Sequence, residues 1–150
     1  NDNAQGQIIV SGNIETIEEL KSILKNNKKK CISLPVSAPF HCSLMKPAAI
    51  KMKEKINIVN FKKPDFEIIS NVNALPVNEP EDIKKLLVEQ IYSKVRWRES
   101  IIFMDKNEIT DFIEIGPGKI LTGLVKRILP HSNSFSINSI DDIKNLTNES

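Results

Sequence analysis

Short β-type runs alternate along this chain with longer amphipathic helical patterns, and this alternation is the feature that most restricts its fold. One helical pattern follows Asn13, and two others begin at Pro47 and Pro80, where the fixed φ of proline suits the first turn of a helix. Alternating strands and helices are typical of an α/β sheet. The predicted β-type runs are residues 7–11, 31–36, 66–70, 109–115 and 134–137.

The last predicted strand–helix step contains a glycine turn. The run 109–115 enters Gly116-Pro117-Gly118, and residues 119–129 follow as an amphipathic helix. A turn of this kind could hold a phosphate at the helix N-terminus. Its spacing is neither that of a P-loop nor that of a dinucleotide-binding fingerprint, so we expect a structural turn. A short helix capped by Ser139 is expected to follow. Apolar residues at helical spacing that we expect in the core are Trp97, Ile101, Met104, Leu121, Leu124, Val125 and Ile128.

The composition excludes several classes of protein. A chain of 150 residues, 40% hydrophobic and 27% charged, is expected to form one soluble globular domain. Its net charge of +2 is too small for a nucleic-acid-binding protein, although it favours an acidic partner. No apolar run approaches the roughly 20 residues that span a bilayer. Cys31 and Cys42 lack metal-ligand spacing, so we expect ordinary thiols in a reducing compartment and no metal site.

One histidine, His41, lies in a stiff loop just before a helical pattern. Pro35 and Pro39 fix φ at their own positions and disfavour helix in the residues before them, so the backbone that leads to His41 is expected to be extended. A loop with so little backbone freedom can hold a side chain in one orientation. A histidine that only packs or hydrogen-bonds in a turn is the simpler interpretation, and the surrounding sequence decides between the two.

The stretch LPVSAPFHCSLMKPAA at residues 34–49 resembles the segment around the active-site histidine of malonyl-CoA:acyl carrier protein transacylases. Four other stretches resemble blocks of the same family, in the family's order. Together the five blocks extend over nearly the whole chain, and they resemble only the C-terminal half of such an enzyme. The other four are NDNAQGQIIVSGN (1–13), EIISNVNALPV (67–77), VEQIYSKVRWRESI (88–101) and EIGPGKILTGLVKRI (114–128).

This resemblance implies an α/β fold made from parts of two subdomains. Residues 1–36 are expected to be the second half of a ferredoxin-like small subdomain, because a single β-α-β unit cannot cover both faces of a sheet. Residues 37–150 are expected to be the C-terminal part of an α/β-hydrolase-like acyltransferase core.

The activity implied by the resemblance is transfer of malonyl from malonyl-CoA to the phosphopantetheine of an acyl carrier protein, in fatty acid biosynthesis, through a serine ester and without a cofactor. His41 takes the position of the family's general base, and imidazole suits this role because it titrates near the working pH. The family's serine lies in a Gly-x-Ser-x-Gly elbow. None of the five glycines here flanks a serine in that way, so the nucleophile is expected from a missing N-terminal half.

Three further residues match positions of the family's site. Gln90 takes the place of the glutamine whose backbone carbonyl receives the other N–H of the histidine and fixes its tautomer. Asn3 matches an asparagine near the substrate pocket. Phe40 matches a residue associated with malonyl over methylmalonyl selection, and its ring would narrow the pocket near an α-methyl group, an effect worth about 1–3 kcal/mol. Two prolines of the family pattern are replaced by Gln5 and Lys94.

The sequence leaves other functions open. A chain without a nucleophile could be a non-catalytic module that binds acyl carrier protein, or a truncated piece with no activity of its own. It could also belong to an acyltransferase domain of a polyketide or fatty-acid multienzyme. A Gly-x-Ser-x-Gly stretch upstream would favour the enzyme, and its absence the binding module. Richness in Lys, Asn and Ile suggests an AT-rich genome, so we expect a soluble protein of a bacterial cytoplasm or a plastid.

Overall fold

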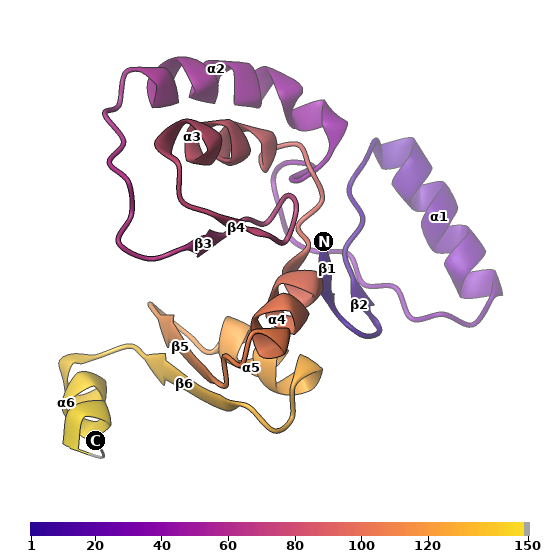
Figure 1. Cartoon of the computed structure of the whole chain (residues 1–150). Coiled ribbons are helices and arrows are strands. Elements are labelled where there is room, and N and C mark those ends of the chain that lie inside the picture. The colour runs from indigo at the N-terminus through magenta and orange to yellow at the C-terminus, as the bar shows by residue number, and fades with distance from the viewer. Residues whose placement is uncertain (149–150) are drawn as a thin grey trace. The chain divides into compact units, whose positions relative to one another are not determined.

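The computed structural model describes residues 1–148, which contain six α-helices and six short strands, and single strands alternate with single helices only from β5 onward (Figure 1). This arrangement agrees with the predicted α/β class. Within the described residues the strands pair two by two, and only the last pair is parallel. The pairs are β1 (Asp2–Ala4) with β2 (Gln7–Ile8), β3 (Ile68–Ile69) with β4 (Pro76–Val77), and β5 (Asp111–Ile115) with β6 (Asn133–Ile137).

Contacts within the chain define two compact units. The first comprises Asn1 with Ile9–Arg96, and the second comprises Asp2–Ile8 with the chain from Trp97 onward. This division describes contacts within the present chain. The boundary between residues 36 and 37 concerns subdomains of a longer protein, so it stays a prediction.

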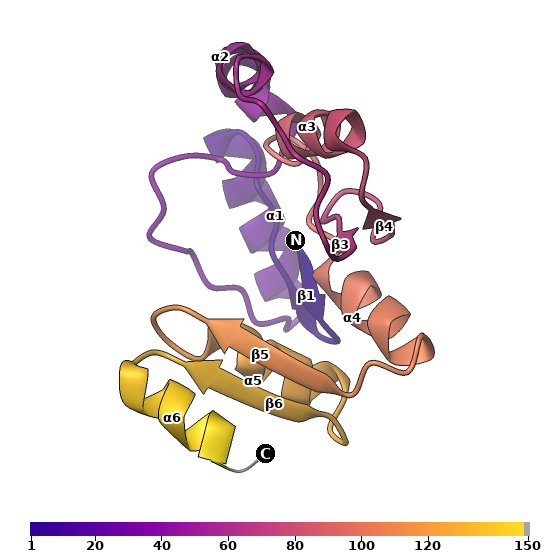
Figure 2. The same cartoon turned by 60° about the vertical axis from the view of Figure 1, so that its left-hand side comes forward.

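The first unit contains α1 (Ile14–Asn26), α2 (Lys46–Asn57), α3 (Pro80–Glu89) and the antiparallel β3–β4 ribbon. The predicted proline starts are confirmed, since α2 has Pro47 in its first turn and α3 begins at Pro80. Helices α2 and α3 lie side by side in both views (Figure 1, Figure 2). Ala49 of α2 and Ile83 of α3 are the buried residues of this helix pair.

Residues 31–36 do not form a strand, so the prediction from their β-type pattern is wrong. They are irregular and exposed throughout, apolar side chains included. A strand forms only when its backbone pairs with a neighbour, and the described residues provide no strand beside this segment. The run 66–70 is shortened to β3 in the same way, and Phe66 is exposed instead of buried.

The second unit is built on the parallel β5–β6 pair, which α5 (Ile120–Ile128) connects and covers on one face. Helix α4 (Trp97–Lys106) packs on α5, as predicted for its apolar face. Burying these apolar surfaces stabilises the unit by about 25 cal/mol per Å² removed from water. Its core consists of Ile101, Val125 and Leu129, with Trp97, Met104, Phe112 and Ile128 packed against them.

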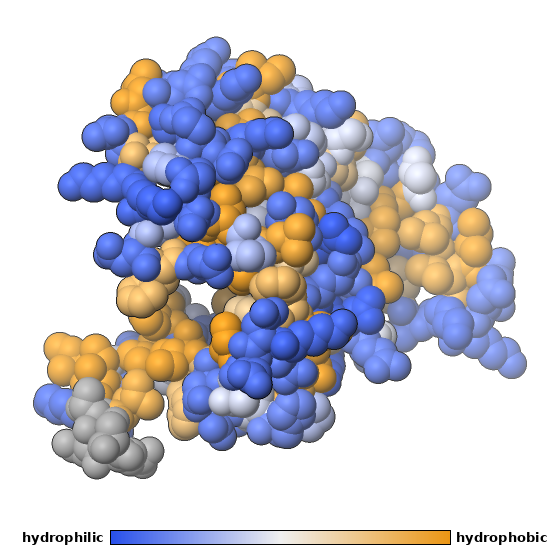
Figure 3. Space-filling view, in the orientation of Figure 1, coloured by the Kyte–Doolittle hydropathy of each residue, from blue (hydrophilic) through white to orange (hydrophobic). Residues whose placement is uncertain are grey.

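The other face of the β5–β6 sheet exposes apolar side chains. Ile113, Ile115 and Phe135 alternate along the two strands and are 49%, 82% and 42% exposed. Figure 3 shows an apolar surface over β5, β6 and α6 (Ile140–Asn148). Parallel sheets are normally covered on both faces, so this face has the composition of a surface that another polypeptide segment covers.

The second unit contains an ion pair between β1 and α4 and a side-chain cap at the start of α6. The Arg98 guanidinium donates to both carboxylate oxygens of Asp2, at 2.9 and 2.8 Å, and so ties β1 to α4. Ser139 caps α6 as predicted: its hydroxyl accepts from the Asp142 N–H at 3.2 Å, while the Asp142 carboxylate accepts from the Ser139 N–H at 2.9 Å.

A carboxylate of the chain itself, that of Glu114, binds the N-terminus of α5 after the glycine turn. Glu114 at the end of β5 accepts hydrogen bonds from the N–H groups of Leu121 and Thr122, at 3.1 and 2.7 Å, and from the Thr122 hydroxyl at 2.8 Å. Its carboxylate therefore occupies the helix N-terminus at which a phosphate would bind. Gly116 and Gly118 have φ of +135° and +101°, values that favour glycine. These contacts agree with a structural turn.

Glu114 should make the stability of this unit depend on pH. The Thr122 amide, donating to the carboxylate, holds the pKa of Glu114 below its ordinary value of 4.5. A carboxyl with a lowered folded-state pKa stabilises the fold above the unfolded pKa, and this contribution is lost as the pH falls through the folded value. Glu114→Gln should therefore have a lower free energy of unfolding than the parent at pH 7. The difference in free energy between the two proteins should shrink as the pH falls below 4.5, the ordinary pKa of a glutamate.

The measurement is urea denaturation of both proteins at a series of pH values. Glu67→Gln, at an exposed glutamate, is the control for loss of one negative charge. A stability difference between Glu114→Gln and the parent that stays constant from neutral to acidic pH would contradict this account of the turn.

Candidate active site

His41 lies in the loop between Pro39 and the 3₁₀ helix η1 (Ser43–Met45), and its side chain is half-buried. Its backbone has φ +60°, in the left-handed region. Few residues other than glycine adopt this conformation, and it costs about 1–2 kcal/mol. Because Lys28, Ala74 and Glu108 also have positive φ, this conformation does not by itself assign a role to His41.

The imidazole of His41 contacts the backbone of Gln90. The distance from His41 Nδ1 to the Gln90 carbonyl oxygen is 2.8 Å. Because a carbonyl only accepts, Nδ1 carries the proton and donates it to this bond. In the neutral ring Nε2 then has a lone pair and can accept a proton. The contact thus fixes the tautomer that a general base requires.

The Gln90 carbonyl is available because of its place in the fold. Gln90 is the C-cap of α3, with φ −61° and ψ −21°, and its N–H donates to the Leu86 carbonyl at 2.9 Å. The last four carbonyls of an α-helix have no partner within the helix.

Asn71 contacts the side chain of Gln90, which the sequence did not predict. Asn71 Nδ2 donates to Gln90 Oε1 at 3.3 Å, and the Asn71 carbonyl accepts from the Arg96 N–H at 2.9 Å. The only signal in the sequence was the place of Asn71 in the stretch 67–77, and no spacing links it to the histidine.

The other two predicted site residues have the following surroundings. Phe40 directly precedes His41 and is 45% exposed. Asn3 is half-buried on β1, in the second unit. The structure therefore brings together His41 and Gln90, with Phe40 beside them in the loop, and the binding roles of Phe40 and Asn3 stay predictions.

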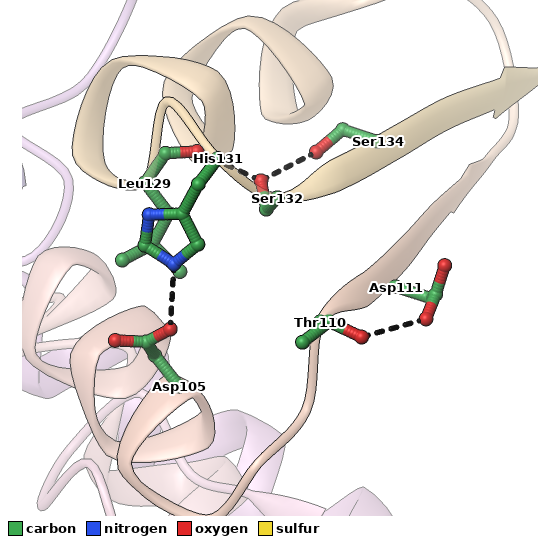
Figure 4. Close-up of polar contacts among 7 residues, drawn as sticks. All are labelled: Asp105, Thr110, Asp111, Leu129, His131, Ser132 and Ser134. Carbon is green, nitrogen blue, oxygen red and sulfur yellow. Dashed lines mark hydrogen bonds and ion pairs between the residues drawn. The ribbon is translucent and has the colours of Figure 1, made fainter.

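A second histidine has serine and aspartate neighbours, but they are not arranged for nucleophilic catalysis (Figure 4). His131 Nε2 lies 3.1 Å from Asp105 Oδ1. The buried Ser132 hydroxyl donates to the Leu129 carbonyl at 2.9 Å and lies 3.1 Å from the Ser134 hydroxyl. The serine hydroxyls thus bind each other and the backbone, and the imidazole binds the carboxylate, as expected for a loop held together by polar contacts.

Residues 1–148 contain neither a cluster of metal ligands nor a helix that could span a membrane. No group of three or more His, Cys, Asp or Glu side chains there is placed to hold a metal ion. No helix in that range combines the length and apolar character needed to cross a membrane. Cys31 is exposed and Cys42 is half-buried, and both are free thiols.

The chain is similar to known proteins in sequence and in fold. No model of a known protein family matches the chain. Among curated proteins, the chain is 43% identical to "Malonyl CoA-acyl carrier protein transacylase" of Bacillus subtilis (strain 168), over 95% of this chain and 45% of that protein. It is 35% identical to the protein of that name from Escherichia coli (strain K12), over 92% and 45%. The chain thus spans less than half the length of these curated relatives.

Solved structures agree in fold. An acyl-carrier-protein-S-malonyltransferase from Bartonella henselae superposes with a TM-score of 0.87 at 37% identity, over 92% of this chain and 44% of that one. A malonyl-transacylase solved in complex with its type II polyketide-synthase acyl carrier protein superposes with a TM-score of 0.86 at 34% identity, over 93% and 45%.

Proposed function

We propose that this chain, a homologue of the malonyl CoA-acyl carrier protein transacylases over nearly its whole length, is the C-terminal half of such an enzyme. The observation that carries the proposal is the 2.8 Å contact between His41 Nδ1 and the Gln90 carbonyl oxygen, within a stretch that resembles the family's histidine segment. We use "complete enzyme" for this chain together with the N-terminal part that carries the nucleophile.

The proposed reaction has two half-reactions. In the first, His41 Nε2 takes the proton of the serine hydroxyl while the serine oxygen attacks the malonyl thioester carbonyl. The carbon–sulfur bond breaks, the imidazolium returns the proton to the departing CoA sulfur, and a malonyl ester remains. In the second, the imidazole takes the proton of the phosphopantetheine thiol, whose sulfur attacks the ester carbonyl. The ester carbon–oxygen bond breaks, and the imidazolium returns the proton to the departing serine oxygen, which restores the serine hydroxyl and the neutral imidazole. The proposed route includes no cofactor.

Two further residues have proposed binding roles. Asn3 would contact the substrate, and Phe40 would limit the space beside the α-carbon of the acyl group. The solved complex of a related malonyl-transacylase with its acyl carrier protein supports a carrier protein as the partner. The relatives named above are bacterial, which supports a bacterial cytoplasm, with a plastid as the alternative.

The exposed apolar face of the β5–β6 sheet supports a half-enzyme. Ile113, Ile115 and Phe135 lie on one face of a parallel pair, which in complete α/β sheets is covered. The curated relatives are more than twice as long as the stretch they share with this chain. We propose that their additional N-terminal part, which supplies the nucleophile, also covers this face.

The 150-residue chain alone should form no malonyl ester, because it contains the base without an elbow serine. The complete enzyme should form one ester per molecule. The test is incubation of each protein with isotopically labelled malonyl-CoA, followed by intact mass spectrometry. A stoichiometric ester on a serine of the isolated chain would contradict this account of the site.

The same measurement separates the proposal from its alternative. Binding of acyl carrier protein by a complete protein that has no Gly-x-Ser-x-Gly stretch and acquires no ester would show that the chain belongs to a non-catalytic binding module. An ester on a serine encoded within a larger multienzyme would assign the chain to an acyltransferase domain.

A further inference from the structure

We infer that Asn71 is a positioning residue for the His41 base and acts through the side chain of Gln90. This inference rests on the proposed function. The backbone carbonyl of Gln90 orients the imidazole, and the Gln90 side-chain oxygen accepts a hydrogen bond from Asn71 at 3.3 Å. Asn71 thus connects to the imidazole through one intervening residue.

Asn71 binds both ends of the segment that leaves α3. Its side chain donates to Gln90, and its carbonyl accepts from the Arg96 N–H at 2.9 Å. Between them, the N–H groups of Ile91 and Tyr92 make longer bonds of 3.3 and 3.2 Å to carbonyls three residues back. Helix ends fray where their backbone bonds are weak. The two contacts of Asn71 therefore restrain the helix end whose carbonyl orients His41.

Asn71 is itself held in a well-bonded turn between β3 and β4. The buried Ser70 donates its N–H to the Leu75 carbonyl at 3.0 Å, and its own carbonyl accepts from the Ala74 N–H at 2.9 Å. The Ser70 hydroxyl also accepts from the Val72 N–H at 3.2 Å. Because these bonds fix the turn from both sides, Asn71 can transmit the position of the β3–β4 ribbon to the end of α3.

The inference predicts that Asn71→Ala in the complete enzyme lowers kcat for malonyl transfer by about 5- to 100-fold, with little change in KM for malonyl-CoA. The lower limit corresponds to loss of one ordinary hydrogen bond, and the upper limit to a displacement of about 1 Å in an oriented site. Asn71→Asp should recover part of the rate, because the Gln90 amide can rotate and donate to the new carboxylate.

A double-mutant cycle tests whether Asn71 acts through Gln90. If it does, the variant that combines Asn71→Ala with Gln90→Ala should be no slower than the slower single variant. Fully additive losses would show that the two residues act independently and would overturn the inference.

Asn73→Ala is the matched control. Asn73 lies in the same turn, and its side-chain oxygen accepts from the Leu75 N–H at 3.1 Å, within the turn. If Asn71→Ala lowers kcat only because the turn is weakened, Asn73→Ala should lower kcat as well. A loss caused by the Gln90 contact should appear in Asn71→Ala and leave kcat of Asn73→Ala at the parental value.

NMR of the His41 Nδ1 proton gives a readout that does not depend on activity. In histidine-labelled complete enzyme this proton should exchange with solvent faster in Asn71→Ala than in the parent or Asn73→Ala. Unchanged exchange together with unchanged kcat in folded Asn71→Ala would overturn the inference. Faster exchange in Asn71→Ala, with full transfer by His41→Ala, would overturn the proposed function and leave the positioning of His41 by Asn71 standing.

Discussion

Replacement of His41 by alanine should slow malonyl transfer by the complete enzyme by about 100- to 10,000-fold, the contribution of a positioned general base. The reason is the fixed tautomer: the Gln90 carbonyl, 2.8 Å from Nδ1, leaves Nε2 to accept the serine proton. Alanine removes this acceptor together with the Nδ1–H donor to the Gln90 carbonyl, so folding is checked separately from activity. The measurement is kcat/KM for malonyl transfer, with circular dichroism to check folding.

His131→Ala is the matched control for loss of a histidine. His131 is the only other histidine of the chain, and its imidazole binds the Asp105 carboxylate at 3.1 Å. This variant should transfer malonyl at the parental rate. If His41→Ala also transferred at that rate, or lost activity only because it unfolded, His41 would be an ordinary hydrogen-bonded residue of a turn.

Ile91→Pro in the complete enzyme should reduce kcat/KM for malonyl transfer by about 100-fold or more, because it moves the Gln90 carbonyl that orients His41. Proline disfavours helical φ and ψ in the residue before it, and Gln90 now has φ −61° and ψ −21°. It also removes the bond from the Ile91 N–H to the Val88 carbonyl. Ile91→Ala keeps this N–H and the backbone freedom, so it is the control at the same position.

Gln90→Ala should be milder than Ile91→Pro and His41→Ala. The carbonyl survives this substitution, and only the contact with Asn71 is lost. All variants are compared by kcat/KM after a folding check. A folded Gln90→Ala as slow as His41→Ala would show that the side-chain amide takes part directly and that the carbonyl assignment is wrong.

Local features of the sequence predicted local structure well. Pro47 and Pro80 lie in the first turns of helices, where the fixed φ of proline fits and its missing N–H is not needed. The apolar spacing of Trp97, Ile101 and Met104 identified residues of the core. Residues 31–36 show the limit of this approach. Their β-type pattern describes what they could do beside a partner strand, and pairing depends on the rest of the fold.

The candidate site was harder to predict from the sequence, because its contacts join residues that are far apart in the chain. His41 and Gln90 are separated by 49 positions, and only the family resemblance linked them before the structure did. Asn71 lies 19 positions from Gln90. A polar contact between two half-buried amides leaves no periodic pattern in a sequence, which is why the structure was needed to find it.

The left-handed backbone of His41 opposes the stability of the fold to the proposed catalytic role at one position. At φ +60° glycine is relaxed, whereas alanine and histidine are strained by about 1–2 kcal/mol. His41→Gly should therefore melt above His41→Ala, although both lack the imidazole. Backbone strain alone thus favours glycine at this position, whereas the proposed general base requires histidine. A stabilisation screen blind to turnover would consequently choose glycine at position 41 and discard the proposed base.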